Sequence, residues 1–208
     1  MARYGMVIDL NRCYGCYACA MACKLANRTP PGVFWARVLR GEMGNFPNSV
    51  RQALPVLCNQ CEEPDCMKVC PTGATFQTDD GIVRVDKNKC IGCSYCVMGC
   101  PYGQRYKVDE WKSYFPEGLS LSEYEEHTKQ FWENKSGVGV STKCDFCIDR
   151  RAEGREPACV QACSAKARVF GDLDDPESEI SYLIKTKRGF VLWPEIGTQP
   201  KVYYLPPR

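Results

Sequence analysis

The chain has 208 residues, enough for one domain or two small ones, and sixteen of them are cysteine. Lysine and arginine number 27 against 25 aspartates and glutamates, so the formal net charge of +2 predicts no nucleic-acid or other polyanionic partner. No apolar run approaches the ~18 residues of a membrane span, and the first residues have no secretory h-region or cleavage site. The sequence therefore predicts neither a transmembrane segment nor a signal peptide.

The first cysteine run follows a predicted short strand at residues 4–9. Its members are Cys13, Cys16, Cys19 and Cys23, spaced C-x2-C-x2-C-x3-C. A short helix over residues 18–27 is expected to hold the last two. Gly15, in the loop before that helix, is either an ordinary turn residue or the residue that lets the backbone approach a bound group.

The next segment is predicted as a strand at residues 33–39 and a loop at residues 41–49 that is rich in Gly, Asn and Pro. Phe34, Trp35 and Phe46 could face a partner protein, but such residues more often belong to a small satellite core. We therefore expect them in the core.

Residues 58–103 contain the second and third runs. The second comprises Cys58, Cys61, Cys66 and Cys70, spaced C-x2-C-x4-C-x3-C, and the third comprises Cys90, Cys93, Cys96 and Cys100, spaced C-x2-C-x2-C-x3-C. Proline follows each run as Pro71 and Pro101, where it ends a short helix. Gly81 follows two aspartates between two β-prone segments, which predicts a hairpin. The order loop, helix, hairpin, loop, helix is that of a two-cluster bacterial ferredoxin.

Residues 104–143 form an insertion without cysteine. Ser122 and Glu125 resemble a capping box, so a helix is predicted over residues 122–132. The insertion is rich in aromatic residues: Trp111, Tyr114, Phe115, Tyr124, Phe131 and Trp132. Such a segment could contact a partner protein or form a lid over the neighbouring sites, and both readings stay open.

The fourth run comprises Cys144, Cys147, Cys159 and Cys163, spaced C-x2-C-x11-C-x3-C. Its charged gap, residues 148–158, is predicted as a solvated loop. A strand at residues 168–170 follows, then a helix with Asp175 as N-cap and Pro176 in its first turn, stopped by Gly189. A last strand is predicted at residues 202–205.

The spacing of the cysteines indicates iron–sulfur clusters. Bacterial ferredoxins use the run C-x2-C-x2-C-x3-C-P, in which three cysteines bind one [4Fe-4S] cluster and the fourth binds another. Structural zinc would explain the C-x2-C pairs but not the C-x3-C endings. Disulfides are not expected, because cysteines in C-x2-C pairs are too close to link distant segments and because the sequence predicts no signal peptide for secretion. Proline ends only the two inner runs, which favours pairing the second run with the third and the first with the fourth. Four clusters of about −2 each would make the loaded protein acidic by about −6.

Catalysis by the chain alone is not expected. It has one histidine, no phosphate-binding loop, no dinucleotide glycine fingerprint and no Ser-His-Asp candidate set.

Four ferredoxin-type runs, followed by the segment from residue 168 to 176 (RVFGDLDDP) and the ending PKVYY at residues 200–204, are similar to one family over nearly the whole chain. The sequence resembles the four-cluster iron–sulfur subunit of the dimethyl-sulfoxide-reductase family of molybdenum or tungsten oxidoreductases. Small subunits of arsenate, polysulfide and tetrathionate reductases and of catechol dehydroxylases and hydroxytransferases are similar too.

The resemblance implies four ligand sets. Set 1 is Cys13, Cys16, Cys19 and Cys163; set 2 is Cys23, Cys144, Cys147 and Cys159; set 3 is Cys70, Cys90, Cys93 and Cys96; set 4 is Cys58, Cys61, Cys66 and Cys100. It also implies that set 1 lies nearest the catalytic subunit and that sets 2, 3 and 4 follow in that order. Since the third run keeps all its cysteines, we expect four [4Fe-4S] clusters and no three-iron cluster.

The expected fold is α+β, with two interleaved bacterial-ferredoxin-like modules and loop-rich insertions. Residues 1–57 and 144–208 would form an outer module, residues 58–103 an inner module, and residues 104–143 a partner-contacting insertion.

The implied function is an electron-transfer subunit that relays single electrons between a redox partner and a molybdopterin-containing catalytic subunit. That subunit would carry a bis-molybdopterin guanine dinucleotide with molybdenum or tungsten, and the redox partner would be a quinol-oxidising membrane subunit or a soluble donor. The complex would lie in the cytoplasm, or in the periplasm after co-export with a partner bearing a twin-arginine signal. A free-standing polyferredoxin that serves several enzymes is the alternative.

Overall fold

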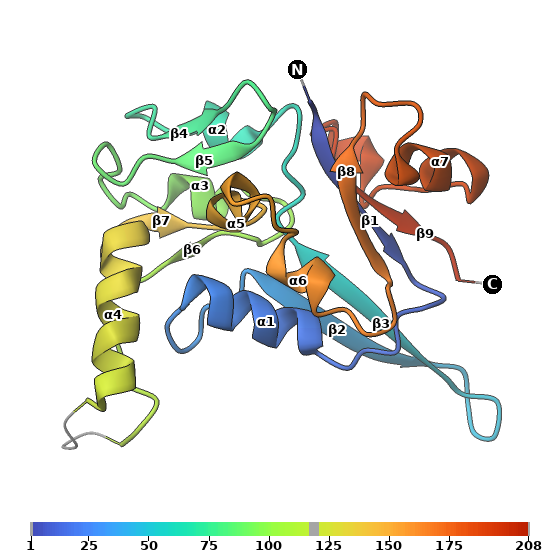
Figure 1. The fold of residues 1–208 in the computed structure, drawn as a ribbon, viewed down its shortest axis with the longest axis horizontal. Coiled ribbons are helices and arrows are strands. Elements are labelled where there is room, and N and C mark those ends of the chain that lie inside the picture. Colours follow the sequence, from blue (N-terminus) through green and yellow to red (C-terminus); the bar gives the residue numbers. More distant parts are fainter. Residues whose placement is uncertain (1, 117–120, 208) are drawn as a thin grey trace.

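A three-stranded sheet brings segments from both ends of the chain together in a computed structural model that describes residues 2–116 and 121–207 (Figure 1). The central strand β1 (Tyr4–Asp9) runs antiparallel to β8 (Arg168–Asp172) and parallel to β9 (Val202–Leu205). All three strands begin where the sequence predicts strands. The structure is mixed α/β with small sheets.

Both faces of β1 are covered, which explains why its centre is uniformly apolar. Met6 and Ile8 belong to the main core, whereas Val7 packs in a second cluster with Ile180 and Leu205. The second cluster lies under helix α7 (Glu179–Thr186). This helix begins later than predicted, because the side chain of Ser178, rather than of Asp175, accepts the capping hydrogen bond.

Helix α1 (Ala18–Asn27) has the predicted bounds and packs against α6 (Ala158–Gln161) and β2 (Ala36–Met43). Strand β2 (Ala36–Met43) forms a long antiparallel hairpin with β3 (Val50–Leu57) that projects from the body in Figure 1. The predicted loop at residues 41–49 is therefore too long. The outer half of the hairpin is exposed on both faces, so its residues have no alternation of polar and apolar side chains to reveal a strand.

The three aromatic residues near this hairpin differ in burial. Trp35 is buried in the main core, as expected, but Phe34 is partly exposed. The core prediction is wrong for Phe46, which lies in the hairpin turn and is 93% exposed.

Residues 58–103 follow the predicted order. Helix α2 (Asp65–Lys68), strands β4 (Thr75–Gln77) and β5 (Val83–Val85), and helix α3 (Tyr95–Met98) occur in turn. The strands pair antiparallel around the predicted turn, which confirms the hairpin.

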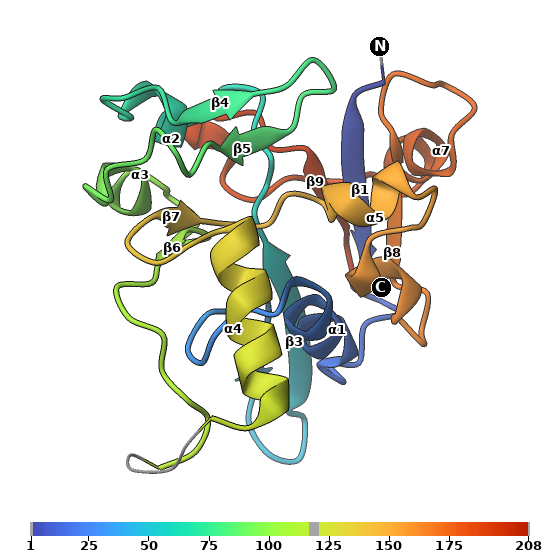
Figure 2. The same cartoon turned by 60° about the vertical axis from the view of Figure 1, so that its left-hand side comes forward.

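The insertion is held by a two-stranded ribbon of β6 (Tyr106–Lys107) and β7 (Ser141–Thr142) and contains helix α4 (Glu123–Lys135). The capping box is present, since Ser122 Oγ accepts from the Glu125 N–H at 3.3 Å and the Glu125 carboxylate accepts from the Ser122 N–H at 3.4 Å. Figure 2 shows α4 beside α1. Part of the predicted insertion, residues 117–120, lies outside the described residues.

The charged gap of the fourth run is not only a loop, because it contains the short helix α5 (Ile148–Ala152). A 3-10 helix (Pro194–Ile196) precedes β9. Among the described residues, no helix combines the length and the apolar character needed to cross a bilayer.

Candidate metal centres

Set 1 lines one cavity. Cys13, Cys16, Cys19 and Cys163 all contribute to its wall, together with residues from the β2–β3 hairpin and β8. Burial raises the pKa of Cys13, and the adjacent thiolates of Cys19 and Cys163 raise it further. The Ala167 N–H donates to Cys163 Sγ at 3.2 Å. Cysteines 150 residues apart in the sequence therefore face the same space.

Set 2 lies in the interior between α1 and the start of α5. Burial raises the pKa of Cys23 well above its usual value, and the nearby thiolates of Cys159 and Cys147 add to this effect. Cys144 is affected in the same way, first by burial and then by Cys23. The amide of buried Asn27 lies 3.6 Å from Cys23 Sγ and 3.9 Å from Cys147 Sγ.

Set 4 joins the second run to the end of the third. Burial raises the pKa of Cys61 to about 12, and the thiolates of Cys58, Cys66 and Cys100 also lie close enough to affect it. All four members of the set are thus neighbours.

Set 3 is organised by Ser141 of β7. Its N–H donates to Cys90 Sγ at 3.4 Å, and its hydroxyl lies 3.2 Å from Cys96 Sγ. Cys70 accepts from the Thr75 N–H at 3.4 Å. The guanidinium of Arg105 links Thr75, beside Cys70, to Ser141, beside the other two cysteines. Its Nη1 donates to Thr75 Oγ1 at 3.1 Å and to Ser141 Oγ at 3.4 Å.

Two interactions join set 2 to set 4. The Cys58 thiolate of set 4 lies close enough to Cys144 to raise its pKa further. Gln60, between two set 4 cysteines, donates from Nε2 to the Cys144 carbonyl oxygen at 2.6 Å. Cysteines of set 4 and of set 2 therefore lie near one another. Set 3 contains Cys93, which is exposed, as is Cys16 of set 1.

These environments suit a cationic inorganic core with thiolate ligands. Burial raises the pKa of Cys159 to about 11, so a buried thiol here stays protonated at neutral pH until a cation replaces its proton. At Cys70, burial also raises the pKa, but hydrogen bonds from Thr75 and Thr72 outweigh it and bring the pKa to about 7. Backbone N–H groups directed at sulfur in three of the sets are contacts that tune iron–sulfur clusters.

Across residues 2–116 and 121–207, no three His, Cys, Asp or Glu side chains converge closely enough to bind one metal ion. A [4Fe-4S] cluster spreads its thiolates over the corners of a cube, a wider arrangement than the tetrahedron around a single zinc ion. The all-sulfur donor sets and their N–H contacts fit the cluster.

Several residues beside the sulfurs were not singled out from the sequence: Asn27, Arg105, Ser141 and Arg168. The arginines carry one sequence signal, since each lies five residues after the last cysteine of its run. Asn27 and Ser141 carry none, because only the packing of distant segments brings them to sulfur.

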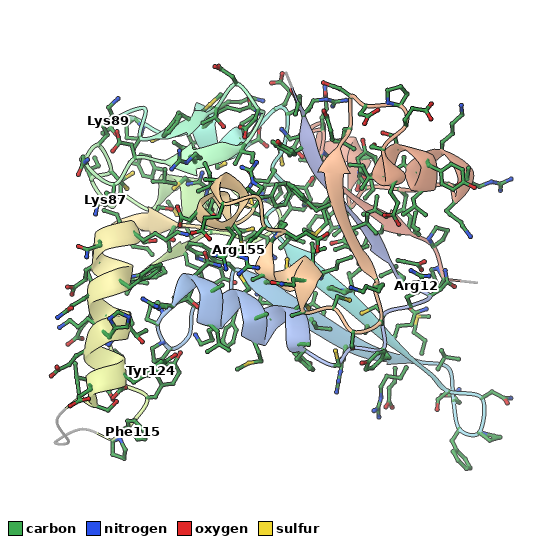
Figure 3. The ribbon with its side chains drawn as sticks, viewed as in Figure 1. Arg12, Lys87, Lys89, Phe115, Tyr124 and Arg155 are labelled. Carbon is green, nitrogen blue, oxygen red and sulfur yellow. The ribbon has the colours of Figure 1, made fainter. Side chains whose placement is uncertain are left out.

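The aromatic residues of the insertion divide into two groups. Trp132 is fully buried and packs on Trp35 with ring centroids 5.8 Å apart. Phe115 and Tyr124 are exposed, and both lie near the start of α4 (Figure 3). The insertion thus has both a core side and a free aromatic side.

Comparisons with known proteins agree with these centres. A family model for the 4Fe-4S dicluster domain matches residues 50–115 and 127–173. The chain is 42% identical to a selenate reductase subunit of Mesobacillus selenatarsenatis, over 96% of this chain and 70% of that one. It is 40% identical to a sulfite dehydrogenase subunit of Allochromatium vinosum, over 100% of this chain and 85% of that one. It is 38% identical to the arsenate respiratory reductase iron-sulfur subunit of a Shewanella species, over 98% of this chain and 96% of that one.

Proposed function

This chain belongs to the electron-transfer iron–sulfur subunits of molybdenum-dependent reductase complexes, and on that premise we propose which cysteines hold each cluster and in what order electrons pass them. The chain relays single electrons through four [4Fe-4S] clusters and is not catalytic alone. Each cluster, when bound, takes up or releases one electron at a time. The polypeptide binds the clusters, spaces them and sets the electrostatic field around each.

The ligands are the four sets implied by the resemblance, each of which takes three cysteines from one run and one from another. The observation that carries this assignment is the common cavity of set 1, which Cys163 shares with three cysteines of the first run. In set 2, Cys23 of the first run lies near Cys147 and Cys159 of the fourth run. In set 4, Cys61 of the second run lies near Cys100 of the third run. Both observations support sets that combine cysteines from two runs.

Electrons pass the sets in the order 1, 2, 4, 3. The electrostatic effect of Cys58 on Cys144 and the hydrogen bond from Gln60 to Cys144 support placing set 4 after set 2. Arg105, which interacts with cysteines of both sets 4 and 3, supports set 3 as the next neighbour of set 4. Exposed Cys16 and Cys93 then belong to the two terminal clusters. An electron can enter at one end and leave at the other without crossing an exposed middle site.

The proposed modules follow the same division of the cysteine sets. Sets 1 and 2 belong to an outer ferredoxin-like module of residues 1–57 and 144–208, which the β8-β1-β9 sheet ties together. Sets 3 and 4 belong to an inner module of residues 58–103, and residues 104–143 form the insertion with its exposed aromatic side facing a partner.

The partner at the set 1 end is a large catalytic subunit with bis-molybdopterin guanine dinucleotide and molybdenum or tungsten. A quinol-oxidising membrane subunit or a soluble donor meets the set 3 end. The complex works in the cytoplasm, or in the periplasm if the catalytic chain carries a twin-arginine signal. Copurification of such a chain under anaerobic conditions supports this assignment, whereas a loaded monomer without a partner supports the free-standing polyferredoxin.

Paired substitutions test the ligand sets directly. If Cys16 and Cys163 share a cluster, replacing both with alanine should remove about four of about sixteen iron atoms, and replacing Cys147 and Cys163 together should remove about eight. If instead each run binds its own cluster, the first double variant should lose about eight iron atoms and the second about four. Iron and sulfide analysis of anaerobically purified complex measures both.

A further inference from the structure

Arg168 places a positive charge between the two clusters of the outer module. It is 3% exposed, and its Nη1 lies 3.5 Å from Met6 Sδ. Within the described part of the chain its Nη2 has no hydrogen-bond partner. Arg168 lines the set 1 cavity, and the thiolates of Cys19 in set 1 and Cys159 in set 2 act on it. Burial lowers the pKa of Arg168, but these thiolates outweigh it and raise the pKa.

Arg105 lies between the cysteines of sets 3 and 4 in the inner module, as Arg168 lies between those of sets 1 and 2 in the outer module. It is 4% exposed, and its Nε and Nη2 have no hydrogen-bond partner among the described residues. Burial lowers its pKa, whereas the thiolates of Cys66 and Cys58 from set 4 and of Cys96 from set 3 raise it, with a net upward shift. Its bonds to Thr75 and Ser141 hold the guanidinium in place.

A buried arginine is ordinarily paired with a carboxylate, because an isolated buried charge is costly. Neither guanidinium has an aspartate or glutamate oxygen among its contacts in residues 2–116 and 121–207. The groups that remain to balance each charge are the thiolates of two neighbouring sets. The equal offset of five residues from Cys100 and Cys163 gives each module one such arginine.

We propose that Arg168 and Arg105 are positioning residues that supply one fixed positive charge to each pair of neighbouring clusters and thereby raise the reduction potentials of both members of the pair. The proposal rests on the ligand sets given above. An electron added to one cluster makes it more negative and repels an electron on the next. A buried guanidinium between them offsets this repulsion and is only weakly screened by salt. Each arginine therefore makes both clusters of its module easier to reduce.

The test is a redox titration of the anaerobically purified complex, followed by electron paramagnetic resonance. For Arg168→Met we expect two of the four clusters to become at least tenfold harder to reduce, which is 59 mV for a one-electron couple, and the other two to stay unchanged. Arg105→Met should shift the complementary two. The lysine variants keep the charge and should shift each pair by less than tenfold.

Arg28→Met is the matched control. Arg28 also lies five residues after the last cysteine of its run, but its guanidinium stacks on the Phe131 ring at 4.2 Å instead of facing sulfur. All four potentials should keep their wild-type values in this variant.

Iron analysis separates this proposal from the ligand assignment. Unchanged potentials in a fully loaded Arg168→Met variant overturn the proposal and leave the ligand sets intact, as does an equal shift of all four clusters. If the methionine variant loses two clusters, retention of both by Arg168→Lys supports the role of charge. Loss in both variants shows that only the shape of the arginine matters and overturns the proposal.

Discussion

The packing of α4 on the interior gives a sharp test of how the insertion is attached. Trp132 is fully buried, belongs to the main core and meets Trp35 at a 5.8 Å centroid distance with a 51° interplanar angle. Replacing a buried tryptophan with alanine costs about 3–5 kcal/mol, because apolar contacts are lost and a cavity remains. For a chain of this length each kcal/mol lowers the unfolding midpoint by about 2–4 °C. We therefore expect Trp132→Ala to lower the midpoint by about 6–20 °C.

The assay is thermal unfolding of the loaded complex, monitored by the visible absorbance of the clusters. Cluster loss makes unfolding irreversible, so midpoints are compared at one heating rate. Gln130→Ala is the control on the same helix, since Gln130 is exposed and its loss should change stability by no more than about 0.5 kcal/mol.

Trp132→Phe separates ring packing from the indole N–H. Trp132 Nε1 has no hydrogen-bond partner among the described residues, and an unpaired buried donor costs about 1–3 kcal/mol. Phenylalanine removes that donor and keeps most of the ring, so it should recover at least half of the loss seen with alanine. Equal midpoints for Trp132→Ala and Gln130→Ala would refute the role of α4 as part of the core.

Three further predictions concern the clusters themselves. Asn27→Leu removes the amide directed at two set 2 sulfurs, so it should make the set 2 cluster harder to reduce and leave the other three unchanged in a redox titration. Gly92→Ala should remove the set 3 cluster, about four iron atoms by analysis, because the φ of Gly92 is 69° and an added Cβ would overlap the Gly139 carbonyl oxygen. Gly103→Ala, with nothing within 4 Å of the added Cβ, should keep all the iron. After removal of the clusters, burial holds the pKa of Cys61 at about 12, above the ~8.5 of an unfolded thiol. The contribution of the Cys61 thiol to the free energy of unfolding should therefore be complete below about pH 8.5 and disappear as the pH rises through about 12. Urea unfolding at a series of pH values measures this. A cluster-free stability that rises over this alkaline range would contradict that sign.

The sequence alone determined the features whose cause is local. Helix α1 and the hairpin at Gly81 depend on periodicity and turn chemistry within a few residues, and the structure has both where they were predicted. The start of α4 follows from the capping box at Ser122. The chemistry of the sites was also local, because the spacing within each cysteine run already indicates an iron–sulfur cluster.

Tertiary structure decided which distant segments meet. The pairing of β1 with β8 and β9 brings Cys163 to the cavity lined by Cys13, and no spacing within a run specifies the neighbour of a cluster in another run. Likewise, only the fold brings Cys58 close enough to Cys144 to raise its pKa. The burial of Arg105 and Arg168 also depends on tertiary structure. An arginine is ordinarily exposed, and only the packing of distant segments buries these two side chains beside the cysteines.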